Sequence, residues 1–494
     1  MAVTFNTIPR GVKSPLFYVE FDNSMANLGD VRNKTLLIGQ MLDGGKAKAN
    51  KPVLVTSTAK GNELFGRGSQ LARMNAAYRQ NDAFGEVWAI PVADPSGGSK
   101  ASGTIKVTGT AEGAGTLYVY VGDTRVPVDI ANKASHEDIA ASIKDAINAN
   151  PDLPVTAAEE SGTVTVSSAG KGEYGDDIKL EVNRYGFAQG EELPEGINVE
   201  VTPMAGGKGS IDVDKALKAM GDEAYEVIVF PFADKDALDK MSLIMNDQSG
   251  RWSPFKQIFG HVFTAKRGDV ETLAGFGKSF NDQHLSIVGV EPALPAMSCE
   301  VLAAYAARTA VSVANDPAQP TQTLQLLGIK PYQAGEGFTL NERQTLMTNG
   351  IATTMCGGSG ICICRGITTY QRNAYGDVDV SYLDSETLFT LAYVIRKLRS
   401  EITSKLGRHK LASDGTAYGP GQAITTPSEI KTMLIAGYRA LEEEGIVEKP
   451  EMFAKFLIVE RDKMDPNRIN VVYPPDLVNQ LRVVAIRTQF RLEY

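Results

Sequence analysis

The sequence predicts an α/β core (α+β overall) with an inserted mostly-β domain and terminal strand-forming arms. Three observations lead to this interpretation. Short apolar runs alternate with helix-like stretches along much of the chain. A block in the first half instead carries short β-rich segments separated by turn residues. Both ends show the period-two alternation that is typical of strands.

Length and composition narrow the classes of protein to consider. The chain has 494 residues, so two to four domains are expected. Its net charge of -9 argues against a direct nucleic-acid binder. No apolar run approaches the ~20 residues that span a bilayer, and no secretory signal is visible, so we expect no membrane insertion. Four cysteines argue against a disulfide scaffold and favour folding in a reducing compartment.

Residues 1–34 are predicted to form an N-terminal linking arm. Phe17, Val19 and Phe21 alternate with polar or amphipathic residues, behind the helix-breaking pair Ser14-Pro15. A strand here either pairs inside its own domain or adds to the sheet of another chain.

The first part of the core α/β domain is placed at residues 35–95. Buried-type strands are expected at 35–39, 52–55 and 86–92. A helix follows Gly66 and Gly68, with Ser69 as its N-cap.

Residues 96–206 are predicted to be an inserted mostly-β outer domain, because loops tolerate insertions well. Ser135 begins its one helix, in which isoleucines recur every four residues. A polar, glycine-rich stretch over 190–209 closes the block. The expected strands are 104–108, 117–121, 126–130, 164–166 and 178–182.

The second part of the core domain is placed at residues 207–460. Strands alternate with helices there, which predicts a small doubly wound sheet, and a hairpin is expected around residues 357–360. A capping box with proline at the first helical position begins helix 427–444. The expected strands are 225–230, 261–263, 285–290, 351–355, 361–369 and 456–459, and the expected helices are 235–248, 297–313, 384–406 and 427–444.

Residues 461–494 are predicted to be C-terminal strands and a linking arm. After a strand at 469–473, alternation from 484 to 494 places Val484, Ile486, Phe490 and Leu492 on one face. Such a terminal strand must also pair, either within its own fold or with another chain.

Candidate chemical sites are few. Cys356, Cys362 and Cys364 lack the fourth ligand of a structural zinc site, so they are interpreted as small buried hydrophobes. Gly66 and Gly68 lack the third glycine of a dinucleotide-binding loop, which favours a turn. No catalytic, cofactor-binding or metal residue is assigned, and a binding or structural protein is favoured over an enzyme.

Four stretches resemble the Mu-type contractile phage tail sheath proteins. They are Phe5-Asn6-Thr7-Ile8-Pro9, the segment 15–22, the segment 64–74 and Asn470-Val471-Val472-Tyr473-Pro474-Pro475-Asp476. The resemblance covers nearly the whole chain, including the inserted β block.

The resemblance implies a non-enzymatic sheath subunit that assembles helically around a tail tube and contracts to drive that tube through the bacterial envelope. It implies hexameric rings, β-strand augmentation by both arms, and assembly in the host cytoplasm before residence in the virion tail. The implied partners are other copies of the chain, the tail tube protein, and baseplate and tail terminator proteins. Tube-facing candidates on helix 427–444 are Lys431, Arg439, Glu442 and Glu443. A Rossmann-like nucleotide-binding enzyme and another self-assembling virion subunit are the alternatives.

Overall fold

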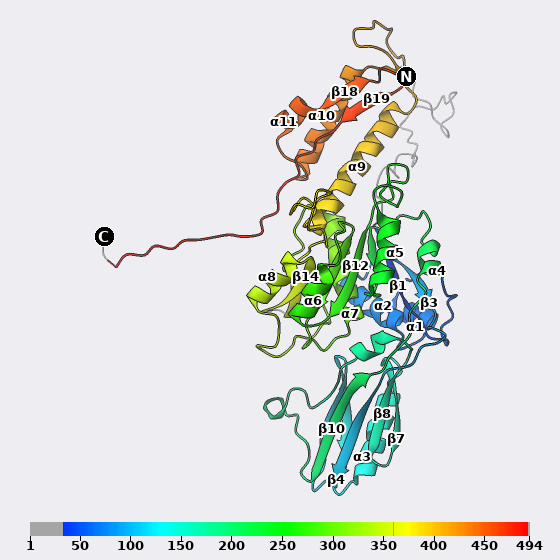
Figure 1. The fold of residues 1–494 in the computed structure, drawn as a ribbon, viewed down its shortest axis with the longest axis vertical. Coiled ribbons are helices and arrows are strands. Elements are labelled where there is room, and N and C mark those ends of the chain that lie inside the picture. The colour runs from blue at the N-terminus through cyan, green and yellow to red at the C-terminus, as the bar shows by residue number, and fades with distance from the viewer. Residues whose placement is uncertain (1–32, 359, 493–494) are drawn as a thin grey trace, which may run out of the picture. The chain divides into compact units, whose positions relative to one another are not determined.

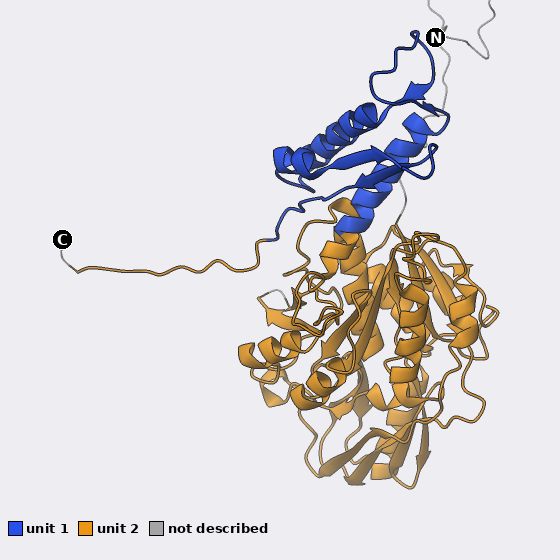
Figure 2. Ribbon diagram, turned by 45° about the horizontal axis from the view of Figure 1, so that its top comes forward, with its two compact units in different colours: residues 1–32, 390–480 blue, residues 33–389, 481–494 orange. Residues whose placement is uncertain are grey.

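The structure is a computed structural model, and it describes residues 33–358 and 360–492. The chain folds into two compact units (Figure 2). Among the described residues, the larger unit comprises 33–389 and 481–492, and the smaller unit comprises 390–480. The chain passes from the larger to the smaller unit within one helix, α9 (Ser385–Leu406).

An eight-stranded sheet forms the centre of the larger unit (Figure 1). Its strands are β1 (Lys34–Gln40), β2 (Val53–Leu54), β3 (Glu86–Val92), β11 (Val227–Val229), β12 (His261–Arg267), β13 (Leu285–Val290), β14 (Ile351–Gly357) and β15 (Gly360–Arg365). They lie in the order β15-β14-β13-β12-β11-β1-β3-β2. All neighbouring pairs are parallel except those at the two edges, β2 with β3 and β14 with β15. The predicted α/β core and its hairpin are therefore confirmed.

Helices cover both faces of this sheet, as the continuous apolar strands require. Leu37 of β1 packs with α2 and α7 in one hydrophobic cluster, while its neighbours Leu36 and Ile38 pack with α4, α5 and α6 in another. The helices of the larger unit's core are α1 (Thr58–Phe65), α2 (Gln70–Asn81), α4 (Asp214–Ala219), α5 (Lys235–Met245), α6 (Val270–Gly277), α7 (Ser298–Asn315) and α8 (Leu340–Thr348).

The β-rich block consists of two antiparallel sheets and one helix, α3 (His136–Asn148). Its strands are β4 (Ser102–Gly109), β5 (Gly115–Val121), β6 (Thr124–Ile130), β7 (Val155–Glu160), β8 (Thr163–Ser168), β9 (Leu180–Val182) and β10 (Ile197–Ala205), with short 3₁₀ turns at Glu173–Asp177 and Phe187–Gln189. The order is β10-β4-β8-β7 in one sheet and β6-β5-β9 in the other. The glycine-rich stretch expected to close the block contains β10, which pairs with β4 along its length.

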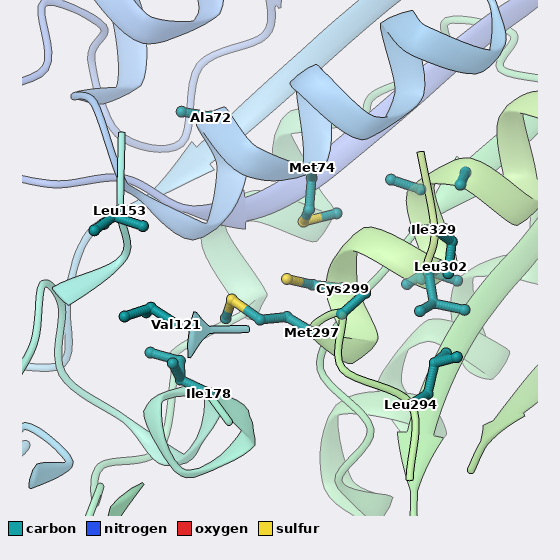
Figure 3. Close-up of a cluster of buried hydrophobic side chains, with 14 of the residues drawn as sticks. Ala72, Met74, Val121, Leu153, Ile178, Leu294, Met297, Cys299, Leu302 and Ile329 are labelled. Carbon is teal, nitrogen blue, oxygen red and sulfur yellow. The ribbon is translucent and has the colours of Figure 1, made fainter. Parts of the chain in front are cut away.

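The β-rich block and the α/β core share one hydrophobic cluster. Val121 and Ile178 from the block lie opposite Met297 and Cys299 at the start of α7, with Met74 of α2 nearby (Figure 3). Asp177 adds a polar tie, since its carboxylate accepts hydrogen bonds from Ser298 and Arg267. Block and core therefore form one packed body.

The smaller unit contains most of α9, α10 (Pro427–Glu443), α11 (Pro450–Phe456) and two short sheets. Its strands are β16 (Lys410–Leu411), β17 (Ile424–Thr425), β18 (Ile458–Arg461) and β19 (Ile469–Val472). Tyr438 of α10 is fully buried and stacks on Phe453 of α11 at 3.7 Å between ring centroids. Within the described residues no helix is long and apolar enough to cross a membrane.

Candidate assembly surfaces

The C-terminal segment 483–492 is the predicted strand that the structure does not form. None of its residues pairs with another described residue, and a strand requires a neighbour to complete its hydrogen bonds. Its apolar side chains are exposed: Val484 by 69%, Ile486 by 82%, Phe490 by 81% and Leu492 by 92%. Pairing of this stretch inside its own domain is therefore absent from the part of the chain that the structure describes.

The corresponding N-terminal candidates lie outside the described residues. Phe17, Val19 and Phe21 precede residue 33, where the description of the chain begins.

The hairpin of β18 and β19 is a two-stranded sheet in the smaller unit. No third strand joins either edge among the described residues. Ile458 lies opposite Val472 in the register, and these side chains are 51% and 55% exposed. Isolated two-stranded sheets are marginal in water, and their edges carry backbone groups that accept a further strand. The sequence analysis did not predict that both edges of this hairpin are open, because alternation over four residues does not reveal what covers a strand.

Helix α10 carries the four tube-facing candidates on the side away from its packing. Leu434 and Tyr438 are among its buried residues, whereas Arg439, Glu442 and Glu443 are exposed and Lys431 is half-buried. These four side chains form no ion pair with another described residue. Glu444, the next residue after the helix, instead binds Tyr393 at 2.8 Å and Lys397 at 3.1 Å.

The glycine-rich turn before α2 has a structural explanation. Gly66 and Gly68 have φ angles of 82° and 77°, which favour glycine. A Cβ atom on Gly68 would lie 2.3 Å from the carbonyl oxygen of Leu153 in the β-rich block. A carbonyl oxygen at this point opposes phosphate binding, so the turn interpretation is preferred.

The cysteine cluster is only partly buried. Cys362 is 4% exposed, Cys364 is half-buried and Cys356 is exposed. The expectation of three small buried hydrophobes is therefore wrong for Cys356. No group of His, Cys, Asp or Glu side chains suited to a metal ion occurs among the described residues.

A pocket of about 250 Å³ lies beside α2, lined in part by Arg73, Asp123, Asp152 and Glu300. The Arg73 guanidinium binds the Glu300 carboxylate, with Nε 2.6 Å from Oε1, and donates to the carbonyl oxygen of Asp152 at 2.9 Å. Because these polar groups satisfy one another, the pocket is better explained as a joint between α2, α7 and the β-rich block than as a ligand site.

Comparisons with known proteins place these surfaces in context. Residues 206–369 match the family model of the phage tail sheath protein central domain, and residues 377–491 match that of the phage tail sheath C-terminal domain. The Mu-like prophage FluMu tail sheath protein of Haemophilus influenzae is 39% identical over 495 residues, covering 100% of each chain.

One solved structure shows a likeness of fold. A chain from the anti-feeding prophage baseplate has a TM-score of 0.50 at 9% identity, covering 97% of this chain and 100% of that one. A sheath tail protein from Desulfitobacterium hafniense has a TM-score of 0.48 at 12% identity, covering 94% and 100%.

The relative that matches over its full length establishes the family of this chain. This family excludes the alternative of a Rossmann-like nucleotide-binding enzyme. Tail sheath proteins are structural proteins of the virion tail, and their family is not enzymatic. The chain therefore belongs to the phage tail sheath protein family and is a subunit of a contractile tail sheath.

Proposed function

We propose that this subunit forms hexameric rings that stack helically around a tail tube, and that its terminal arms join neighbouring subunits by β-strand augmentation. The assembly would form in the host cytoplasm, and its contraction would drive the tube through the bacterial envelope without NTP hydrolysis. Its partners are further copies of the chain, the tail tube protein, and baseplate and tail terminator proteins.

The exposed C-terminal segment carries this proposal. Val484, Ile486, Phe490 and Leu492 repeat with the period of a strand, yet each is more than two-thirds exposed. Apolar side chains arranged in this way are expected to be covered by another molecule. We assign Phe17, Val19 and Phe21 of the N-terminal arm the same intersubunit role, because their alternation is similar.

Among the described residues, the β18–β19 hairpin is the acceptor that we assign to such an arm. A strand added along the four residues of β19 would form about four backbone hydrogen bonds, each contributing about 0.5–1.5 kcal/mol. Burial of Ile486 and Phe490 would add roughly 1.5–3 kcal/mol each. Ordering the backbone costs about 1–2 kcal/mol per residue, so one joint alone is weak. Assembly therefore depends on many joints that form together in rings.

A proline scan of the C-terminal segment tests this mode of joining. Proline removes one backbone N–H, and alternate N–H groups of an edge strand point toward its partner. Substitution to proline at successive positions from 484 to 489 should therefore impair sheath formation with a period of two residues. Electron microscopy of the assembled protein gives the readout. An effect that is the same at every position, or absent, contradicts the edge-strand mode.

Arm deletion supplies the coarser test. Chains that lack residues 1–21 or 484–494 should remain soluble monomers and form no long sheaths. Long sheaths from a chain that lacks both arms would rule out the arms as joints.

The charged face of α10 is proposed to meet the tube. Half-buried Lys431 and exposed Arg439, Glu442 and Glu443 can form screened ion pairs of at most about 1 kcal/mol each, which break easily during movement. Lys431→Glu with Arg439→Glu should weaken assembly that is templated by tubes, most strongly at low salt. Lys100→Glu with Lys106→Glu, a double charge reversal on exposed residues of the β-rich block, is the matched control. Equal yields of tube-templated sheath from both variants would remove α10 from the tube interface.

A further inference from the structure

Arg482 forms several polar contacts directly before the exposed C-terminal segment 483–492. Arg482 is 12% exposed, and it is the last residue before the exposed stretch 483–492. Its Nη2 lies 3.0 Å from Oδ1 of Asp384 and 3.3 Å from Oε2 of Glu386. Its Nη1 donates to Oε1 of Gln322 at 3.1 Å. Beyond Arg482, no residue of 483–492 forms a hydrogen bond or ion pair with another described residue.

The groups that bind Arg482 are themselves fixed. Glu386, in the first turn of α9, is fully buried, and it accepts hydrogen bonds from the backbone N–H and the hydroxyl of Thr321 at 2.8 and 2.7 Å. Asp384 accepts two parallel bonds from Arg365, at 2.8 and 2.9 Å. The Arg365 pKa is raised by these bonds to Asp384. The two carboxylates thus face two guanidinium groups, those of Arg365 and Arg482. The opposite charges offset the free-energy cost of burying each charged group.

This cluster is continuous with the edge of the eight-stranded sheet. Arg365 is the last residue of β15, the edge strand. The backbone of residues 323–326 pairs with β15, through Thr323 N–H to Ile363 O at 2.8 Å and Leu326 N–H to Ile361 O at 2.8 Å. Gln322 precedes that stretch and also donates to the carbonyl oxygen of Leu481 at 3.1 Å. The bonds of Arg482 therefore lead to the eight-stranded sheet by two routes, one through Asp384 and Arg365 and one through Gln322.

We infer that Arg482 is the anchor of the C-terminal arm: it transmits a pull on that arm into the eight-stranded sheet at one buried charge cluster. The inference rests on the proposed function, in which the arm is bound by a neighbouring subunit. The pull enters the larger unit at Arg482, because the smaller unit ends at residue 480. Without the anchor, the same pull would act on the connection to the smaller unit.

Arginine suits this position better than lysine. Its planar guanidinium contacts Asp384, Glu386 and Gln322 at once, whereas an ammonium group has no comparable fixed fork. Arg482→Lys should preserve the charge balance and weaken the anchor. Arg482→Gln alone would leave buried Glu386 without this cation, so Arg482→Gln with Glu386→Gln is the variant that removes the anchor while keeping the buried site neutral.

The experiment measures the concentration of free subunits in equilibrium with assembled sheaths. Relative to the unchanged chain, we expect at least a tenfold increase for the Arg482→Gln/Glu386→Gln double variant, equivalent to about 1.4 kcal/mol. Arg482→Lys should give an intermediate increase. Arg408→Gln, which removes an exposed arginine outside the arm, should have no comparable effect. Urea unfolding of the unassembled subunits should give matching midpoints for the double variant and the unchanged chain.

Each outcome has a defined meaning. Equal free-subunit concentrations for the double variant and the unchanged chain would overturn the anchor. An equal loss in Arg408→Gln would also overturn it, because general charge attraction would then explain the effect. If the double variant unfolds at a lower urea concentration than the unchanged chain, the test of the anchor rests on Arg482→Lys. Sheaths of Arg482→Lys that are as stable as those of the unchanged chain refute the anchor. A chain that lacks residues 484–494 separates the proposed function from the anchor. If this chain assembles normally, the proposed function is rejected. If it fails to assemble while the double variant assembles normally, only the anchor is rejected.

Discussion

His261 in β12 makes the larger unit sensitive to acid. The side chain is 1% exposed, and its Nε2 lies 2.8 Å from the hydroxyl oxygen of Ser286. That hydroxyl donates its own proton to the carbonyl oxygen of Ile367 at 2.6 Å, so it can only accept from His261. Nε2 therefore carries the proton, and Nδ1 has no hydrogen-bond partner within the described chain. A second proton would place an N–H group at Nδ1 in a buried position that offers no acceptor.

Burial, with a smaller effect from the charge of nearby His284, lowers the pKa of His261 to about 3. The pKa in the unfolded chain is about 6.5. Between these values the unfolded chain binds the additional proton and the folded chain does not. Stability from this residue is therefore complete above pH 6.5 and is lost as the pH falls toward 3. Each pH unit corresponds to about 1.4 kcal/mol, so acidification to pH 5 should cost about 2 kcal/mol.

The perturbation is His261→Gln, which keeps a donor at the ε position for Ser286 and cannot titrate. Unfolding in urea is followed by tryptophan emission from pH 8 to pH 5, since Trp88 and Trp252 both lie in the larger unit. The unchanged chain should lose about 2 kcal/mol more than His261→Gln over this range. His409→Gln, at an exposed position, is the matched control. Identical pH dependence in the unchanged chain and His261→Gln would refute the reasoning.

Two further predictions concern packing within each unit. Arg73→Met should lower the free energy of unfolding of the larger unit by about 3–5 kcal/mol, because Glu300 keeps a buried charge, whereas exposed Arg67→Met should cost under about 1 kcal/mol. A similar cost for both in urea would contradict the buried joint. Tyr438→Phe should destabilise the smaller unit by about 1–3 kcal/mol, because the Asp476 N–H loses its acceptor at 3.0 Å. An unchanged calorimetric transition of that unit would exclude this role.

The core was predictable because its strands are buried on both faces. The apolar runs at 35–39, 86–92 and 285–290 correspond to β1, β3 and β13, and fully covered strands must be continuously apolar. Helix starts were also predictable where a side chain caps them. Ser69 accepts from Ala72 N–H, as predicted, and Thr426 and Glu429 form the expected capping box.

Helix ends and phases were less predictable. Helix α5 ends at Met245 rather than 248, because the Asn246 side chain accepts backbone N–H groups from the next residues and stops the helix. In α9, Ile395 is 36% exposed, while its neighbour Val394 is fully buried. Periodicity alone did not set the phase, because neighbouring elements decide which side of a long helix is covered.

For the C-terminal arm, the sequence predicted only a preference for an extended strand. Alternation from 484 to 494 indicates a chain that favours an extended strand, but no sequence pattern names its partner. The Arg482 cluster was invisible for a related reason. Its members come from positions 322, 365, 384, 386 and 482, and only the fold brings these distant residues together.

A contractile assembly requires joints that persist and contacts that change, and the proposed roles of the arms and α10 would separate the two by chemistry. Backbone hydrogen bonds along an added strand do not depend on particular side-chain packing, so such a joint can survive rotation of the bodies that it links. Three of the four candidate charges of α10 are exposed, so contacts made by them would be screened and would exchange at little cost. The larger unit is packed on both faces of its sheet and through the Arg73–Glu300 joint, which favours movement as a rigid body. Free energy released on contraction would then come from exchange of contacts between subunits, while the Arg482 anchor keeps each arm attached to the body that moves.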